Sequence, residues 1–256
     1  MKIGAQTFTI RESMKTPEDI RVSLLKLADI GYRYAQLSRW GEIEPELLRE
    51  YADAAGVSLL LTHTPPERIV GETDAVIREH RIIGANWVGL GMMPKEYRDD
   101  PKEADAYLKT LEKPVEAIRK AGLRFCYHNH AFEFRRVNGE RIIEHMLEHF
   151  SAEQMGIILD AYWVQVAGAD VCSWIEKLKG RLDCVHLKDC AVSPEDWKLQ
   201  QFAPIGSGNM DYPKILRAFE DAGTQYAFVE QDKCYDRDPF DCLKESFDYL
   251  HAEGWC

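Results

Sequence analysis

The chain alternates short strand-like runs with amphipathic helix-like segments eight times, and few folds accommodate such a pattern. The strand-like runs are apolar and often β-branched or aromatic, and they are residues 3–10, 34–37, 57–62, 87–91, 123–128, 156–159, 182–187 and 225–230. Parallel neighbours need a crossover connection, so strict alternation predicts a parallel sheet. Eight units in 256 residues match a closed (β/α)8 TIM barrel, and we expect a single domain over residues 1–256.

The helix-like segments carry start and stop signals. The first has Thr16 as a candidate N-cap, Pro17 at the first helical position and Gly31 after its end. The segment 101–122 carries the same kind of start and stop signals, but Pro114 inside it is expected to kink or split the helix. No GxGxxG follows the first strand and no Gly-, Ser- or Pro-rich linker divides the chain. We therefore favour the barrel over an open, doubly wound sheet.

Charge and cysteine usage restrict partners and compartment. The net charge of -11 disfavours nucleic acid and anionic lipid as partners, because both bind through clustered Lys and Arg. Seven cysteines without a CxxC pair are typical of a reducing compartment. No apolar run approaches the length of a membrane-spanning helix or a secretory signal, so we expect a soluble, cytoplasmic protein.

Ionisable side chains gather where the expected strands end. They are His63, then His128 and His130, then Asp160, then His186, Lys188 and Asp189, and finally Glu230 and Asp232. In a parallel barrel these ends share one rim, where catalytic residues from distant parts of the chain meet. Imidazoles and carboxylates suit one divalent ion, Mn²⁺, Mg²⁺, Co²⁺ or Zn²⁺, with positions left open for a substrate.

Five segments make the chain resemble the sugar phosphate isomerase/epimerase superfamily of xylose isomerase-like barrels, relatives of inosose dehydratase, hydroxypyruvate isomerase and ketose 3-epimerases. The segments are YHNHAFEF (127–134), ILDAYWVQVAG (158–168), VHLKD (185–189), IGSGNMDYPKIL (205–216) and FVEQD (228–232). The resemblance covers essentially the whole chain. It is specific for the superfamily and says little about the substrate.

The resemblance implies one divalent metal ion bound by Glu, Asp, His and Glu from successive late strands. Matched motif by motif, the last three ligands are Asp160, His186 and Glu230. The first ligand is open. Relatives carry a glutamate on the fifth strand, whereas here Glu133 lies beyond it and reaches the metal only if the chain turns after His130. Without that turn, His130 is the substitute.

The resemblance further implies a sugar isomerase or epimerase that removes a proton next to a carbonyl and passes through an enediolate. We assign proton transfer to Glu133 and Glu230, and stabilisation of oxygen charge to His130 and Lys188. The residues expected to contact a small sugar or keto-sugar are His63, His128 and Trp163. The alternatives are a metal-dependent dehydratase or lyase, and a non-catalytic sugar-binding or partner subunit. Relatives are commonly homo-oligomers.

Two short motifs suggest other chemistry. GSGN, residues 206–209, could offer backbone N–H groups to a phosphate or could be a plain tight turn. HMLEH, residues 145–149, matches the HxxEH signature of a zinc metalloprotease with Glu148 as the base, but we expect it on the helix after the fifth strand. A DNA-repair endonuclease of the related barrel group is opposed by the acidic charge.

Overall fold

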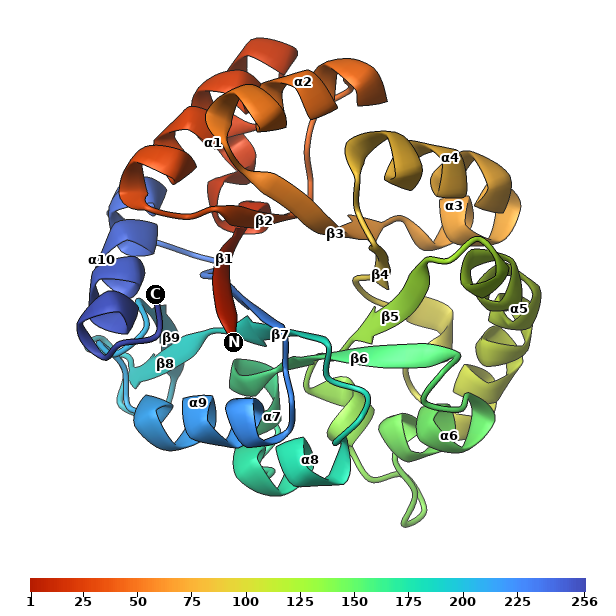
Figure 1. Ribbon diagram of the computed structural model, residues 1–256. Coiled ribbons are helices and arrows are strands. Elements are labelled where there is room, and N and C mark those ends of the chain that lie inside the picture. The colour runs from red at the N-terminus through yellow and green to blue at the C-terminus, as the bar shows by residue number, and fades with distance from the viewer.

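The computed structural model describes residues 1–256, and in it eight parallel strands close into a barrel surrounded by helices (Figure 1). The barrel strands are β1 (Lys2–Gln6), β2 (Tyr34–Leu37), β3 (Ser58–Thr64), β4 (Trp87–Leu90), β5 (Arg124–His128), β6 (Met155–Asp160), β7 (Cys184–Leu187) and β10 (Tyr226–Val229). All pairings in the ring are parallel, and β10 lies between β7 and β1 to close it. The predicted TIM barrel is confirmed.

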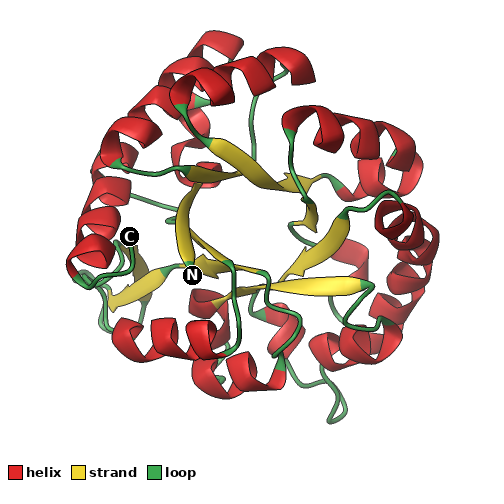
Figure 2. Ribbon diagram, in the orientation of Figure 1, coloured by secondary structure: helices red, strands yellow, loops and turns green.

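Helices form the outer layer of the barrel (Figure 2). They are α1 (Pro17–Ile30), α2 (Pro45–Ala55), α3 (Pro66–Gly71), α4 (Thr73–Ile83), α5 (Pro101–Lys120), α6 (Ile142–His149), α7 (Ala161–Val166), α8 (Val171–Lys177), α9 (Tyr212–Asp221) and α10 (Pro239–Ala252), with 3-10 turns η1 (Thr7–Ser13), η2 (Lys95–Tyr97) and η3 (Phe132–Phe134). α1 begins with the expected signal, since the side chains and backbone N–H groups of Thr16 and Asp19 bond reciprocally. None of the helices combines the length and the apolar character needed to cross a membrane.

The local structure differs from the prediction in two places. The first strand ends at Gln6 rather than at residue 10, because the Gln6 side chain accepts a hydrogen bond from the Phe8 N–H and starts η1. α5 continues as one helix through Pro114, so the predicted split is wrong, while the alternative of a kink there stays a prediction. Pro114 itself is buried with the apolar face of α5, and this packing outweighs the one hydrogen bond that proline cannot make.

A hairpin that the sequence did not predict follows β7. Its antiparallel strands are β8 (Asp189–Val192) and β9 (Gln200–Ala203). The buried carboxylate of Asp189 fastens its base by accepting hydrogen bonds from the backbone N–H groups of Cys190, Gly206, Gly208 and Met210. Within residues 206–209, the N–H groups of Gly206 and Gly208 donate to this internal carboxylate, and those of Ser207 and Asn209 donate to backbone carbonyl oxygens. All four N–H groups are used within the protein, so this loop is a turn rather than a phosphate site.

The barrel interior is filled in layers, because side chains alternate in direction along each strand. One layer is apolar and contains Leu61, Cys126, Ile158, Cys184 and Phe228. Two residues further along the same strands, the side chains are polar, and they are His63, His128, Asp160, His186 and Glu230. The apolar layer is therefore the floor beneath a polar rim at the C-terminal ends of the strands.

Candidate metal centre and substrate cavity

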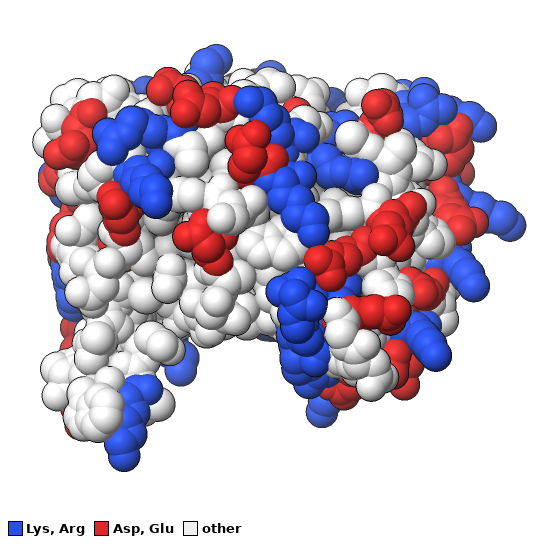
Figure 3. All heavy atoms as spheres, turned by 90° about the horizontal axis from the view of Figure 1, so that it is seen from below, with Lys and Arg blue, Asp and Glu red and all other residues white.

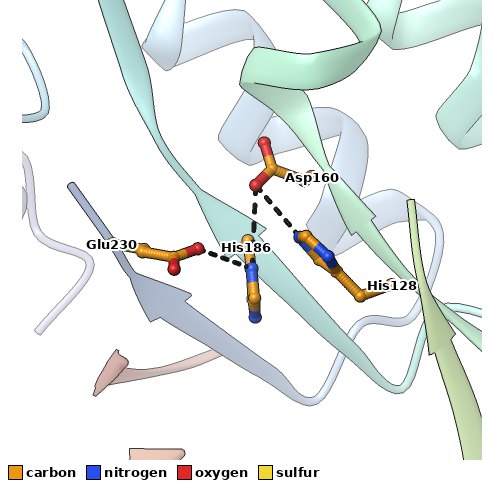
Figure 4. A group of neighbouring side chains, drawn as sticks. All are labelled: His128, Asp160, His186 and Glu230. Atoms are coloured by element: carbon orange, nitrogen blue, oxygen red, sulfur yellow. Dashed lines mark hydrogen bonds and ion pairs between the residues drawn. The ribbon is translucent and has the colours of Figure 1, made fainter. Parts of the chain in front are cut away.

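Four ionisable side chains converge at this rim (Figure 4). They are His128 from β5, Asp160 from β6, His186 from β7 and Glu230 directly after β10. One ligand-type atom of each lies within 4.8 Å of those of the others, and all four residues are buried. Two imidazoles and two carboxylates at this spacing form a donor set for a divalent cation.

Both histidines have one ring nitrogen fixed by an outer partner. Nδ1 of His128 donates to the carbonyl oxygen of Gly91 at 3.0 Å, and Nε2 of His186 donates to Oε1 of Gln36 at 2.7 Å. A neutral imidazole carries a single N–H, so these bonds leave Nε2 of His128 and Nδ1 of His186 as lone-pair donors. Outer partners of this kind orient the rings of metal-binding histidines.

The two carboxylates are fixed in the same way. Oδ1 of Asp160 accepts from the backbone N–H of Trp163 at 3.1 Å, and Oε1 of Glu230 accepts from Nε2 of Gln6 at 2.8 Å. The remaining oxygens, Oδ2 of Asp160 and Oε2 of Glu230, approach Nδ1 of His186 at 3.7 and 3.0 Å. All four side chains thus direct one atom toward a common centre.

The environment of His186 indicates that a cation belongs at this centre. Its Nδ1 is buried and has no hydrogen-bond partner. A lone pair facing two carboxylate oxygens is repulsive unless a proton or a metal ion lies between them. Burial opposes protonation of His186, but the Glu230 and Asp160 carboxylates outweigh it and raise the pKa of the imidazole. The donor set and this unpartnered atom fit a divalent ion.

The carboxylates of the cluster are in the ionised form that metal binding requires. Burial works against ionisation of Asp160, but the Lys188 ammonium and the adjacent His128 and His186 rings hold its pKa well below the usual range. The pKa of Glu230 is also well below its usual range, because Lys188 and His186 outweigh the effect of burial.

Glu133 does not join the cluster, which corrects its expected roles as metal ligand and proton-transfer group. Its Oε1 accepts from the Tyr127 hydroxyl and its Oε2 from the backbone N–H of His130, both at 2.7 Å. Glu133 is fully buried and does not line the cavity. His128 takes the β5 position in the cluster, and His130, the expected substitute, lies outside it.

Replacing Glu133 by Gln is expected to change how stability depends on pH. Burial raises the pKa of Glu133 to about 7, although hydrogen bonds from Tyr127 and His130 oppose the rise. Because the pKa of Glu133 is higher in the folded than in the unfolded protein, protonation of Glu133 contributes to the free energy of unfolding. This contribution is complete below the unfolded pKa, near 4.3, and is lost as pH rises through about 7. At about 1.4 kcal/mol per pKa unit, this contribution is roughly 4 kcal/mol.

The check is urea denaturation of both proteins between about pH 5 and about pH 8, with the free energy of unfolding compared at each pH. The Gln variant should become more stable relative to the unchanged protein as pH rises through this range. Parallel curves for the two proteins would show that Glu133 ionises normally and would contradict the buried, protonatable state.

A cavity of about 1130 Å³ adjoins the cluster. Its lining includes His63, His130, Trp163, Lys188 and Asp232. Three buried nitrogens on these side chains have no hydrogen-bond partner, and they are Nε2 of His63, Nδ1 of His130 and Nε1 of Trp163. Because these three nitrogens belong to side chains that line the cavity, they are available as hydrogen-bond partners for polar groups of a bound molecule. The volume slightly exceeds the usual range for a small-molecule site.

Two residues of the site, Gln6 and Gln36, were not among the sequence candidates. They are register neighbours on β1 and β2 and point into the polar layer, where they hold Glu230 and His186. Both are completely buried. An amide within a short apolar strand is costly unless it has a partner, and that is the signal that could have identified them.

The histidines of the 145–149 motif do not form a site. They lie on α6 and bond carboxylates of the neighbouring helix α5, His145 with Asp105 at 3.0 Å and His149 with Glu112 at 3.0 Å. The two imidazoles engage different partners instead of converging on one point. This arrangement offers no metalloprotease centre, as expected.

The surface in Figure 3 is hollowed between two projections, and acidic and basic side chains intermingle over its upper and right-hand parts, whereas its lower left part is mostly uncharged. Lysines and arginines are dispersed among carboxylates on this face. Nucleic acid is bound through contiguous basic surface, and this face does not provide it.

The fold and the rim together define a class of protein: a (β/α)8 barrel with a His, Asp, His and Glu cluster at the C-terminal ends of its strands. The chain belongs to the xylose isomerase-like TIM barrel family, whose profile matches residues 24–252.

Solved structures with the same fold carry several related activities. A sugar phosphate isomerase/epimerase from Parabacteroides distasonis is 23% identical with a TM-score of 0.83, and the alignment covers 99% of this chain and 94% of that one. L-ribulose 3-epimerase is 16% identical with a TM-score of 0.74 over 98% and 94% of the two chains. The IOLI protein, solved with a bound zinc atom, is 14% identical with a TM-score of 0.75 over 98% and 97%. No curated protein matches the chain.

Proposed function

We propose that the protein is a divalent-metal-dependent sugar isomerase or epimerase that removes a proton from the carbon next to a carbonyl. The observation that carries this proposal is the convergence of four donor atoms beside a cavity whose lining has unpartnered nitrogens. The four donor atoms suit a metal ion, and the cavity nitrogens suit the hydroxyl groups of a sugar. The zinc atom in the IOLI protein and the epimerase activity of another relative agree with it.

The proposed ligands are Nε2 of His128, Oδ2 of Asp160, Nδ1 of His186 and Oε2 of Glu230. A divalent ion bound there would polarise a sugar carbonyl and acidify the adjacent C–H. The ligand atoms keep their directions through their outer partners. Neither Glu230 oxygen is free for proton transfer in this arrangement, because Gln6 holds one and the cluster uses the other.

His130 is the proposed proton acceptor. Burial lowers the pKa of its imidazole well below the usual value, with the nearby His128 adding to the effect, so the ring is neutral at pH 7. Nδ1 of His130 has no partner, and the residue lines the cavity. Glu133 anchors the backbone N–H of His130 and thereby fixes the turn that carries the ring. A neutral imidazole has a lone pair that can accept a proton, whereas the lowered pKa makes the ring a weaker base than a histidine that titrates near pH 7.

His63 and Trp163 are proposed to bind and orient the substrate. Nε2 of His63 and Nε1 of Trp163 offer partners for sugar hydroxyls. The Trp163 ring lies 5.3 Å from the His130 ring, between centroids. An aromatic face next to the proposed base gives a wall against which a sugar ring can pack.

The test is hydrogen exchange between substrate and solvent. The Mn²⁺-loaded protein is incubated in deuterated water with a panel of ketoses and keto-sugars, and NMR follows loss of each C–H signal. We expect exchange next to the carbonyl of at least one sugar and a fall of about 100-fold or more for His130→Ala. Glu148→Gln, on the exposed side of α6, serves as the control with unchanged exchange.

The products separate the possible outcomes. Return of the proton gives an isomer or epimer, whereas loss of a β-hydroxyl gives an unsaturated product and would identify a dehydratase, the activity named for another structural neighbour described as a probable 3-DHS dehydratase. No exchange with any sugar of the panel, from a protein that retains metal, would contradict the proposal and favour a sugar-binding subunit.

A further inference from the structure

Lys188 lies at the centre of the cluster although it is a charged side chain. It is 1% exposed, two residues after His186 on the same inward-facing row. Its ammonium lies 3.0 Å from Oδ2 of Asp160, 2.9 Å from Oε2 of Glu230 and 2.9 Å from Oδ1 of Asp232. A buried lysine is stable only with such compensation.

Two of these contacts use the oxygens that the cluster offers to a metal ion. Oδ2 of Asp160 and Oε2 of Glu230 face both the Lys188 ammonium and Nδ1 of His186. The ammonium and a divalent ion therefore draw on the same two atoms. The third contact, with Asp232, lies outside the four-residue cluster.

The charges of the site leave room for both cations. Asp160, Glu230 and Asp232 carry three negative charges when ionised, and Lys188 balances one of them. A divalent ion supplies the other two, so the complete set is neutral, which is the condition for a stable group of buried charges. The lysine therefore need not leave the site when a metal ion is bound.

We propose that Lys188 is a displaceable counter-ion of the metal site: it neutralises Asp160 and Glu230 in the metal-free protein and yields both to the divalent ion, keeping Asp232. Because Asp232 retains the ammonium, Lys188 can give up its other two partners when the metal ion binds and does not have to exclude the ion. Asp232 is a positioning residue, because it acts by retaining the ammonium. The released ammonium remains at the cavity wall, where both Lys188 and Asp232 lie. This inference rests on the metal site of the proposed function.

The test measures metal affinity, by isothermal titration with Mn²⁺ and with Zn²⁺, for the unchanged protein, Lys188→Met, Asp232→Asn and the double variant. Removing the competing charge should tighten binding by at least about 10-fold in Lys188→Met. Asp232→Asn should weaken binding by a similar factor, because the ammonium then has no other partner. In the Lys188→Met background the Asp232→Asn change should have a markedly smaller effect.

Two further variants keep the test decisive if Lys188→Met does not fold. Circular dichroism checks the folding of every variant. Lys188→Gln is neutral and can still donate to Asp232, so it should also bind metal more tightly. Lys188→Arg keeps the charge and should not. Unchanged or weaker binding in both neutral variants would overturn the exchange and make Lys188 a structural support of the ligands.

The remaining outcomes are also decisive. Equal effects of Asp232→Asn with and without Lys188 would overturn the role of Asp232. Metal binding by Lys188→Met alone, and not by the unchanged protein, would show that the lysine excludes the ion. Failure of every variant to bind would overturn the metal-dependent function itself, whereas normal binding with no difference among variants would overturn only this inference.

Discussion

Replacing Asp160 by Asn, or Glu230 by Gln, is expected to remove divalent metal from the protein while leaving the barrel folded. Each change takes a charged ligand from the cluster, and the loss of affinity should exceed the 10- to 100-fold typical of losing an outer partner. The outer hydrogen bonds from Trp163 and Gln6 can be kept by the amide oxygens. The new side chains therefore retain their positions and lose only their charge.

The measurement is metal content by mass spectrometry after equilibrium dialysis against Mn²⁺ and Zn²⁺, with circular dichroism as the folding check. Glu148→Gln removes one negative charge at an exposed position of α6 and is the matched control, with full metal content expected. Normal metal content in both cluster variants would mean that these carboxylates do not hold the ion.

The second large effect is expected from Asp189→Ala, which should lower the free energy of unfolding by roughly 3–5 kcal/mol. The Asp189 carboxylate is fully buried and is the acceptor for four backbone N–H groups of the β8 start and the 206–210 loop. Alanine would leave these four N–H groups, which lie in a buried to part-buried region, without their shared acceptor.

Chemical denaturation gives this value, and Asp189→Asn is the matched control because its single carbonyl oxygen can replace only part of the acceptor capacity. Its loss of stability should be smaller than that of the alanine variant. The loop backbone lies directly against this carboxylate, since a Cβ on Gly208 would clash with Oδ1 of Asp189. A loss below about 1 kcal/mol for alanine would contradict the anchoring role.

The barrel could be predicted because its signals are local. Each strand is a short apolar run, and each helix carries its own start and stop residues, as Thr16 and Gly31 do for α1. Eight repeats of that local pattern leave few topologies. The β8–β9 hairpin escaped prediction because its strands are partly exposed and mix polar with apolar residues, so they lack the apolar run that marks the barrel strands.

The residues of the site could be predicted only where their position at the end of a strand fixes their place at the rim. Asp160, His186 and Glu230 were identified by their places at strand ends, and the structure brings them together. The fourth member could not be assigned because it depends on the path of the chain after β5. The Glu133 carboxylate accepts a hydrogen bond from the His130 N–H, which holds it away from the rim. His128 is therefore the β5 residue of the cluster.

The most direct test of the central claim is an anomalous difference map from crystals grown with Mn²⁺ or Zn²⁺. The account predicts one strong peak within about 2.0–2.3 Å of Nε2 of His128, Oδ2 of Asp160, Nδ1 of His186 and Oε2 of Glu230. The absence of a peak at that point, with the ion bound elsewhere or not at all, would contradict it.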